Sequence, residues 1–415
     1  MRILWLSHLV PYPPKGGVLQ RSYHLLNQTS KYFDVDLIAF NQPNLMAPMF
    51  ESQEKGLNIS KAKLGEFCKS IDIFNIPSGS SGLNKLALAF KSLLSKDPYN
   101  INWLKSNEYA EKIKLALVEK DYDLVHFDTI CLYPFLPLIP KNISISLDHH
   151  NIESEMLHRR CANESNPLKK LYFWQEAKRL ESYERTFCKV AGVNITCSEL
   201  DSERLLKLVP EARTEDIPNG VDIDYFTPIQ PEKTSEKKII FIGRLNWYPN
   251  TKAVLYLANQ IWPLLKATIP DITCDIIGAN PPSQVLELSK QDPSFKVHGF
   301  VDDIIPYMKP NTVYVCPITD GGGTKLKILD ALAMGMPIVA DPIACEGINV
   351  TNQMNVLFSN TPEQYIENIK RILSDDDLSK QLSLNARELA ENEYSYNSIG
   401  QKLSKTFTDT IQRHR

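Results

Sequence analysis

Short β-branched runs alternate along the chain with longer stretches whose apolar residues recur every three or four positions. Such alternation is typical of parallel sheets covered by helices on both faces. The runs form two series, one in each half of the chain. The expected strands are Ile3–Ser7, Val35–Phe40, Ile71–Ile76, Leu124–Phe127, Ile143–Leu147 and Val193–Cys197 in the first series, and Ile239–Ile242, Thr273–Ile277, Lys296–His298, Val313–Cys316 and Pro337–Ala340 in the second.

A polar segment at 225–238 separates the two series. It contains Pro228 and Pro231 and no apolar run, which is typical of a linker. The sequence therefore predicts an α/β protein with two Rossmann-like, doubly wound parallel-sheet domains that face each other across a ligand cleft. The expected domains are 1–230 on the acceptor side, 231–395 on the nucleotide side, and a C-terminal helix, 396–415, that returns to the first domain.

Composition narrows the class of protein. The net charge of −3 provides no basic field for nucleic acid, so no nucleic-acid partner is expected. The eight cysteines are scattered without metal-ligand spacing, which favours reduced thiols and a cytoplasmic location. No apolar run is long enough for a transmembrane helix, and the run at Met1–Leu6 is too short for a signal peptide.

The most informative stretch follows the expected strand at 313–316 and opens a helix. It begins at Asp320, and glycines occupy 321–323. Consecutive glycines let the backbone approach a ligand without clashes from Cβ atoms. A helix start also presents unpaired N–H groups and positive dipole character to an anion. The sequence therefore predicts a phosphate site at this loop.

Charged residues in the same helix support that interpretation. Lys325 and Lys327 lie at the positive end of the helix dipole, which costs about 0.3–1 kcal/mol each unless an anion is bound. Asp330 follows Lys327 by three residues on the same helical face, where a carboxylate can accept hydrogen bonds from a ribose diol. The alternative is a glycine loop followed by a solvated Lys/Asp helix face.

Two further groups of candidate residues follow expected strands in the first half. Gly16 and Gly17 precede a helix at 18–31, and Arg21 is placed one turn in, within reach of a phosphate; a plain strand-to-helix turn explains the glycine pair equally well. His149 and His150 follow the fifth strand, at the edge where α/β proteins build sites. One histidine is expected to bind a sugar hydroxyl or a phosphate or to act as a base. Alternatively, this cluster caps the next helix through Asp148 or Asn151.

The second series begins with a strand that ends in Gly243 and Arg244. An arginine at that position is placed to bind phosphate in fork geometry. Lys252 is a possible second cation, although a surface charge is the simpler interpretation. The segment Ile217–Asp222, which includes Asn219, is a turn by composition.

Two amphipathic segments have two interpretations each. Residues 83–96 combine an apolar stripe with three lysines, and 168–174 combine two lysines with three aromatic residues. Either segment can lie on an anionic membrane surface. Packing against the protein core is the more common fate of such helices, and we favour it here.

Together these blocks resemble the GT-B glycosyltransferases, in particular the large retaining family 4 group. The resemblance covers nearly the whole chain in order. Its most specific parts are Ile217–Asp222, which reads Ile-Pro-Asn-Gly-Val-Asp, and Gly321–Pro337. The resemblance implies retaining transfer of a sugar from a UDP- or GDP-sugar to a glycan or lipid-linked acceptor, in surface polysaccharide assembly. It implies no cofactor and no metal, and it allows peripheral association with the inner face of a membrane.

The resemblance also implies roles for the matching residues. His150 would contact the transferred sugar or the acceptor, and Arg244 would bind the diphosphate together with lysines. The catalytic candidates are therefore His150, Arg244 and Lys327. The donor-binding candidates are Gly16, Gly17, Arg244, Gly322, Gly323, Thr324, Lys325 and Asp330, with Asp320, Lys252, Arg21 and Asn219 as further candidates.

One departure from the family pattern keeps alternatives open. The family has two glutamates with seven residues between them, whereas this chain has Gly322 and Asp330 at those positions, with Asp320 as a possible substitute for the first. A sugar-nucleotide epimerase on the same scaffold and a non-catalytic nucleotide-sugar-binding relative are the alternatives. A nicotinamide-dependent dehydrogenase is less well supported, because no Gly-x-Gly-x-x-Gly run follows the first strand.

Overall fold

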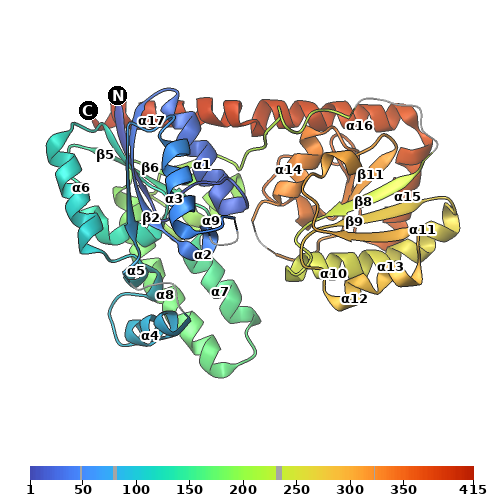
Figure 1. Ribbon diagram of the computed structural model, residues 1–415, viewed down its shortest axis with the longest axis horizontal. Helices are drawn as coiled ribbons and strands as arrows, with labels where there is room; N and C mark the ends of the chain where they lie inside the picture. The colour runs from blue at the N-terminus through green and yellow to red at the C-terminus, as the bar shows by residue number, and fades with distance from the viewer. Residues whose placement is uncertain (47–48, 78–81, 230–235, 322) are drawn as a thin grey trace. The chain divides into compact units, whose positions relative to one another are not determined.

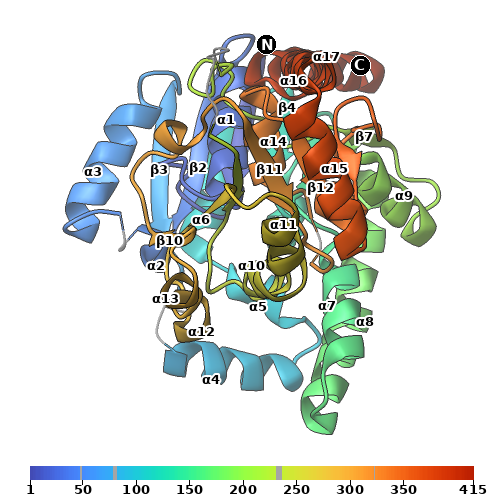
Figure 2. The same cartoon turned by 90° about the vertical axis from the view of Figure 1, so that its right-hand side faces the viewer.

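The computed structural model describes residues 1–46, 49–77, 82–229, 236–321 and 323–415. The chain forms two compact units, one of residues 1–218 and 399–415 and one of residues 219–398. Each unit is built on an open parallel sheet with helices on both of its faces (Figures 1 and 2). The expected α/β class with two parallel-sheet domains is therefore confirmed.

The sheet of the first unit has seven strands in the order β3-β2-β1-β4-β5-β6-β7. The strand order reverses between β1 and β4, which lie side by side in parallel register. In doubly wound sheets, ligands bind outside the carboxyl ends of the strands at this reversal. The strands are β1 (Arg2–Ser7), β2 (Asp34–Asn41), β3 (Ser70–Asn75), β4 (Leu124–Phe127), β5 (Ser144–His149), β6 (Val193–Thr196) and β7 (Thr214–Asp216).

Alternating side chains of these strands build two cores, one on each face of the sheet. Leu4 and Leu6 of β1 belong to one buried cluster, whereas Ile3 and Trp5 belong to the other. This follows from the two-residue period of a strand. The helices are α1 (Gly17–Ser30), α2 (Pro43–Met46), α3 (Gln53–Leu64), α4 (Gly82–Leu93), α5 (Tyr99–Trp103), α6 (Asn107–Glu119), η1 (Ile130–Leu138), α7 (Glu153–Asn163), α8 (Pro167–Val190), α9 (Glu199–Leu208) and α17 (Tyr396–His414).

The sheet of the second unit has six strands in the order β10-β9-β8-β11-β12-β13, so its reversal lies between β8 and β11. The strands are β8 (Lys238–Ile242), β9 (Thr273–Ile277), β10 (Phe295–Gly299), β11 (Thr312–Cys316), β12 (Ile338–Ala340) and β13 (Leu357–Phe358). The helices are α10 (Tyr248–Tyr256), η2 (Leu257–Ile261), α11 (Trp262–Thr268), α12 (Ser283–Leu286), α13 (Leu288–Gln291), η3 (Ile305–Tyr307), α14 (Leu326–Ala333), η4 (Pro342–Cys345), α15 (Pro362–Ser374), α16 (Asp376–Leu389) and η5 (Ala390–Tyr394).

The boundary between the units differs from the expected one. The first unit ends at Pro218, whereas the sequence places the boundary at 230. Residues after Pro218 are hydrogen-bonded to the second unit, since Arg387 donates to the carbonyl oxygen of Phe226 at 2.7 Å and Val221 donates its N–H to Tyr394 at 2.8 Å. These bonds join residues more than 150 positions apart, so proline and charge content near 230 do not reveal them.

Helix α17 belongs mainly to the first unit, which contains it from Ile399 onward, although it follows the second unit in the sequence and begins at Tyr396. Its buried side chains Ile399, Leu403, Phe407 and Ile411 join the same cluster as Ile3 and other strand residues. Their spacing of three to four residues places them on one helical face. In the described part of the chain, no helix is both long and apolar enough to cross a membrane.

We expect Phe407→Ala to lower the free energy of unfolding by about 3–5 kcal/mol, because a fully buried aromatic side chain leaves a cavity when truncated. Urea denaturation followed by circular dichroism measures the change. Lys405→Ala, at an exposed position of the same helix, is the control and should change the free energy by less than about 0.5 kcal/mol. Equal effects of the two substitutions would contradict the packing of this helix on the first unit.

Candidate functional site

The carboxyl ends of β8 and β11 bring together the two phosphate-binding candidates of the second unit. Gly243 and Arg244 directly follow β8, and the glycine-rich loop leads from β11 to α14. Asn250 links them, because its Nδ2 donates to the carbonyl oxygen of Arg244 at 2.8 Å and its Oδ1 accepts from Lys327 Nζ at 2.7 Å. The sequence motifs expected to act together therefore do meet in space, at the strand-order reversal of this sheet.

Two glycines make this approach possible. A Cβ atom on Gly243 would lie 2.2 Å from Lys327 Nζ and 2.9 Å from Asn250 Nδ2. Gly321 has φ of +98°, a conformation that side chains disfavour, and a Cβ there would lie 3.1 Å from Cγ of Pro249. Glycine at both positions therefore keeps the lysine and the loop close to the end of β8.

Lys327 and Asp330 occupy an environment that disfavours charge. Burial lowers the pKa of Lys327 to about 8 and raises that of Asp330 to about 7. The ammonium group also lies 4.5 Å from the centroid of the Phe241 ring. An anionic ligand beside Lys327 would favour the charged form of the lysine. The charge state of Lys327 would therefore change when a phosphate binds.

The remaining loop residues lie around this pair. Lys325 directly precedes α14, and its Nζ donates to the carbonyl oxygen of Gly321 at 2.6 Å and lies 4.0 Å from Glu346. Asp320 is exposed and accepts a hydrogen bond from the Gly321 N–H at 2.7 Å. Gly323, with φ of +75°, and Thr324 are partly buried, whereas Gly322 lies outside the described residues.

Arg244 and Lys252 are both exposed, and neither side chain forms a hydrogen bond or ion pair with any described residue. The backbone of Arg244 is fixed by Asn250, so its guanidinium is carried on a defined strand end. Lys252 lies within α10. Asn219 is partly buried at the start of the second unit, and the turn expected in this segment is stabilised by Asp222, which accepts from the N–H groups of Asp224 and Tyr225.

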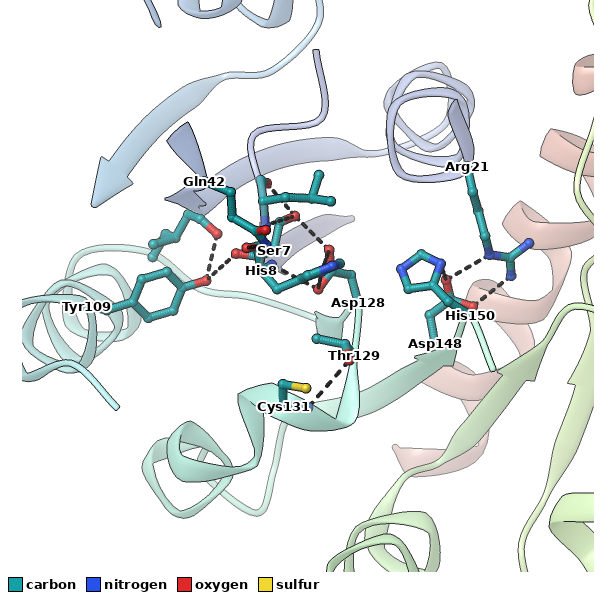
Figure 3. A network of polar contacts seen from close by, with 12 residues as sticks. Ser7, His8, Arg21, Gln42, Tyr109, Asp128, Thr129, Cys131, Asp148 and His150 are labelled. Carbon is teal, nitrogen blue, oxygen red and sulfur yellow. Dashed lines mark hydrogen bonds and ion pairs between the residues drawn. The ribbon is translucent and has the colours of Figure 1, made fainter. Parts of the chain in front are cut away.

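A second polar cluster lies at the strand-order reversal of the first unit. His8 follows β1 and Asp128 follows β4, and these strands are neighbours. His8 Nδ1 lies 3.0 Å from both carboxylate oxygens of Asp128, and Ser7 Oγ donates to the same carboxylate at 2.6 Å (Figure 3). Burial lowers the pKa of His8, but the Asp128 carboxylate outweighs this effect, and the pKa is raised overall. The pair therefore favours the charged form of the histidine.

His150 lies beside that pair. Its ring centroid is 5.6 Å from that of His8, and both ring nitrogens are buried without a hydrogen-bond partner among the described residues. Burial lowers the pKa of His150 to about 4, so the ring is neutral near pH 7. A neutral imidazole with two unused nitrogens is equipped to bind a ligand hydroxyl. His149 differs, because its Nε2 lies 3.2 Å from Asn194 Oδ1. The two adjacent histidines therefore contact different groups.

Arg21 does not face a ligand, and its expected phosphate role is wrong. The guanidinium is buried and binds both carboxylate oxygens of Asp148, at 3.0 and 2.7 Å, while Nη1 donates to the carbonyl oxygen of Ile217 at 2.8 Å (Figure 3). This pairing holds the pKa of Asp148 at about 2 although burial raises it. The capping alternative for Asp148 fails for the same reason, and the residue before α7 is Ile152, which has no side-chain cap.

The glycine pair of the first unit lies at the start of a helix. Gly16, with φ of +91°, and Gly17 are exposed at the start of α1, as the sequence predicts for a strand-to-helix turn. His8, Asp128 and His150 could together hold a metal ion, because one potential ligand atom from each lies within 4.8 Å of the others. The expectation that no metal is needed stays a prediction.

This chain is similar to known proteins in sequence and in fold. Residues 236–375 match the model of the family described as glycosyl transferases group 1. The fold matches sucrose-phosphate synthase from Thermosynechococcus elongatus with a TM-score of 0.66 at 16% identity, over the full length of both chains. It also matches HepE from Anabaena in complex with UDP, with a TM-score of 0.64 at 15% identity, over 99% of this chain and 100% of that one.

The chain carries a group 1 glycosyltransferase domain at residues 236–375. Its two parallel-sheet units have the GT-B fold. It is 22% identical to a 44.6 kDa protein in the cps region of Klebsiella pneumoniae, over 97% of this chain and 99% of the relative. It is 21% identical to an Escherichia coli UDP-Gal:α-D-GlcNAc-diphosphoundecaprenol α-1,3-galactosyltransferase, over 75% of this chain and 82% of the relative.

Sequence reasoning missed His8, Asp128 and Asn250 in this glycosyltransferase. His8 and Asp128 carry a readable signal, because each directly follows a strand that the sequence predicts correctly. Applying the strand-end rule to all strands, and not only to those with glycine or adjacent histidines, would have identified both. Asn250 has no such signal, since it lies inside α10 and its contact with Lys327 joins residues distant in sequence.

We expect Arg21→Met to lower the free energy of unfolding of the glycosyltransferase by about 3–5 kcal/mol, because it leaves the Asp148 carboxylate buried and unpaired. Urea denaturation measures this loss, and the double variant Arg21→Met/Asp148→Asn should recover part of it. Binding of UDP at a temperature where the variant is folded should be unchanged. A variant that keeps its stability but loses UDP affinity would restore the phosphate-binding role.

Proposed function

We propose that this glycosyltransferase transfers a sugar from a UDP-sugar, with retention of anomeric configuration, to a lipid-linked diphosphate acceptor during surface polysaccharide assembly. The single observation that carries the proposal is the link through Asn250 between Lys327 and the backbone of Arg244, at the strand-order reversal of the second unit. It gathers cationic groups and a helix start where such sheets bind ligands.

The chemical step needs a stabilised leaving group more than a protein nucleophile. As the sugar departs, negative charge builds up on the diphosphate. Arg244, Lys327 and the N–H groups at the start of α14 are the groups we assign to that charge, and preorganised donors of this kind lower the barrier electrostatically. Asp330 is assigned to the ribose hydroxyls, and His150 to a hydroxyl of the transferred sugar or of the acceptor.

The choice of donor and acceptor rests on relatives. HepE is a structural neighbour that has been solved in complexes with UDP and with UDP-glucose. The Escherichia coli relative is named for UDP-Gal and a diphosphoundecaprenol acceptor, and the Klebsiella relative is named for the cps region. These names support uridine as the base and a lipid-linked acceptor.

Arg244→Ala should lower kcat/KM at least a hundredfold, because it removes a cation from the leaving diphosphate. Lys252→Ala is the matched control, since it also removes an exposed cation without an internal contact, and it should change kcat/KM less than threefold. Release of UDP from UDP-sugars in the presence of a lipid-linked acceptor is the assay.

The same reaction tests the remaining claims. Nuclear magnetic resonance of the early product should show the anomeric configuration of the donor. Equal losses for Arg244→Ala and Lys252→Ala would remove the arginine from the diphosphate site. Interconversion of UDP-sugars without an acceptor would indicate an epimerase, and an absence of UDP binding would indicate a non-catalytic relative.

UDP affinity should be highest between pH about 7 and about 8. Below this range Asp330 takes up a proton and accepts ribose hydrogen bonds poorly, whereas above it Lys327 loses the charge that attracts the diphosphate. Isothermal titration calorimetry across the pH range measures the profile. Lys327→Gln should abolish the alkaline decline and Asp330→Asn the acidic one. A profile that neither substitution alters would place UDP elsewhere.

A further inference from the structure

Helix α4 of the first unit exposes its apolar stripe. The exposed fractions are 70% for Leu86, 67% for Phe90 and 80% for Leu94, which directly follows the helix, and Leu93 at the end of the helix is also exposed. Their spacing of three to four residues places them along one side of the helix. The expectation that this segment packs against the core is therefore wrong, because the side available for packing faces solvent.

The start of α8 repeats the pattern. Leu168, Leu171 and Trp174 are 80%, 59% and 50% exposed, at intervals of three residues. The sequence interpretation of a partly buried helix holds for Phe173 but not for these three. Arg179, in the same helix, donates from Nη1 to the carbonyl oxygens of Ser92 and Ser95, both at 2.8 Å. The end of α4 is thus fixed to α8, about 8 Å along the helix from Trp174.

Lysines accompany both stripes. Residues 82–96 contain Lys85, Lys91 and Lys96 and no acidic residue, and residues 167–175 contain Lys169 and Lys170 and no acidic residue. These five positive charges stand out in a chain whose net charge is −3. Helical geometry places Lys85 and Lys91 on opposite sides of the α4 stripe. We call the two segments, 82–96 and 167–175, the basic apolar surface.

We propose that the basic apolar surface binds an anionic lipid bilayer, with Leu86 and Phe90 of α4, Leu94 directly after α4, and Leu168, Leu171 and Trp174 of α8 entering the interfacial region. Apolar side chains flanked by lysines gain from both acyl chains and anionic headgroups. Lysine is depleted in protein–protein interfaces, which disfavours a second copy or another protein as the occupant. A tryptophan at the edge of the stripe suits the polar–apolar boundary of a membrane.

The placement also connects this surface to the candidate site. Helix α7, which with α8 forms a hairpin, begins at Glu153, three residues after His150. In both views α4 and the free end of the α7–α8 hairpin project from the same end of the first unit (Figures 1 and 2). The purpose of bilayer binding rests on the proposed function, since a lipid-linked acceptor is embedded in a bilayer. Bilayer binding itself does not require that function.

Flotation of the purified full chain with vesicles tests the proposal. Phosphatidylcholine vesicles with about one third phosphatidylglycerol should carry the protein upward, and phosphatidylcholine alone should carry at least tenfold less. Added salt should reduce binding because it screens the lysines. On binding, the tryptophan fluorescence should shift to the blue, and Trp174→Phe should remove most of that shift.

Matched variants separate this surface from general stickiness. The triple variant Leu86→Ser, Phe90→Ser and Leu94→Ser should lose at least tenfold in vesicle affinity. The control is Leu115→Ser with Val118→Ser, at positions of α6 that are 48% and 85% exposed, and it should bind as the wild type does. Lys85→Glu with Lys91→Glu should likewise weaken binding, whereas Lys31→Glu with Lys61→Glu, at exposed positions directly after α1 and within α3, should not.

Several results would overturn the proposal. These are no flotation of the wild type, equal flotation on neutral vesicles, equal loss in the α6 control, or a dimer in sedimentation that the triple variant abolishes. UDP binding by the triple variant should match the wild type, which shows that the fold is intact. Failure of UDP binding in the wild type would count against the proposed transferase activity alone, because flotation uses no nucleotide.

Discussion

The arrangement of the second unit depends on one amide side chain. Asn250 donates to the carbonyl oxygen of Arg244 and accepts from Lys327, so it joins the strand end that carries the arginine to the helix that carries the lysine. Lysine at a helix start opposes the helix dipole, and here it is also partly buried. The structure retains this unfavourable cation by giving it one neutral acceptor and an aromatic face rather than a carboxylate. The positive charge therefore stays available to a ligand.

The first unit has the opposite arrangement of charge. Its buried charges at the strand ends are neutralised internally, Arg21 by Asp148 and His8 by Asp128. His150 lies close to both pairs and is left neutral, with both ring nitrogens unused. In the second unit, Lys327 keeps a positive charge that a ligand can use. In the first unit, His150 keeps two ring nitrogens that can form hydrogen bonds with a ligand. The sugar transfer that we propose would use both properties.

Much of this was predictable from the sequence, for identifiable reasons. A continuous apolar run such as Ile3, Leu4, Trp5 and Leu6 marks a strand buried on both faces, and all eleven expected strands are present within about two residues. The short strands β7 and β13 were missed because two or three residues carry no periodicity. The roles of Arg21 and α4 were misjudged because they depend on which partner a side chain meets. Asp148 is 127 positions from Arg21, and an apolar stripe looks the same whether it faces a core or solvent.

The order in which the chain is synthesised gives the final helix a further consequence. The face of the first sheet that contains Ile3 and Trp5 is completed by residues 399–411 of α17. Because the ribosome makes the whole second unit first, the part of that apolar face covered by α17 stays exposed until translation is nearly finished. The nascent first half must therefore be shielded from aggregation for most of the time of synthesis, and a chain that stops before Ile399 would leave this part of the core open.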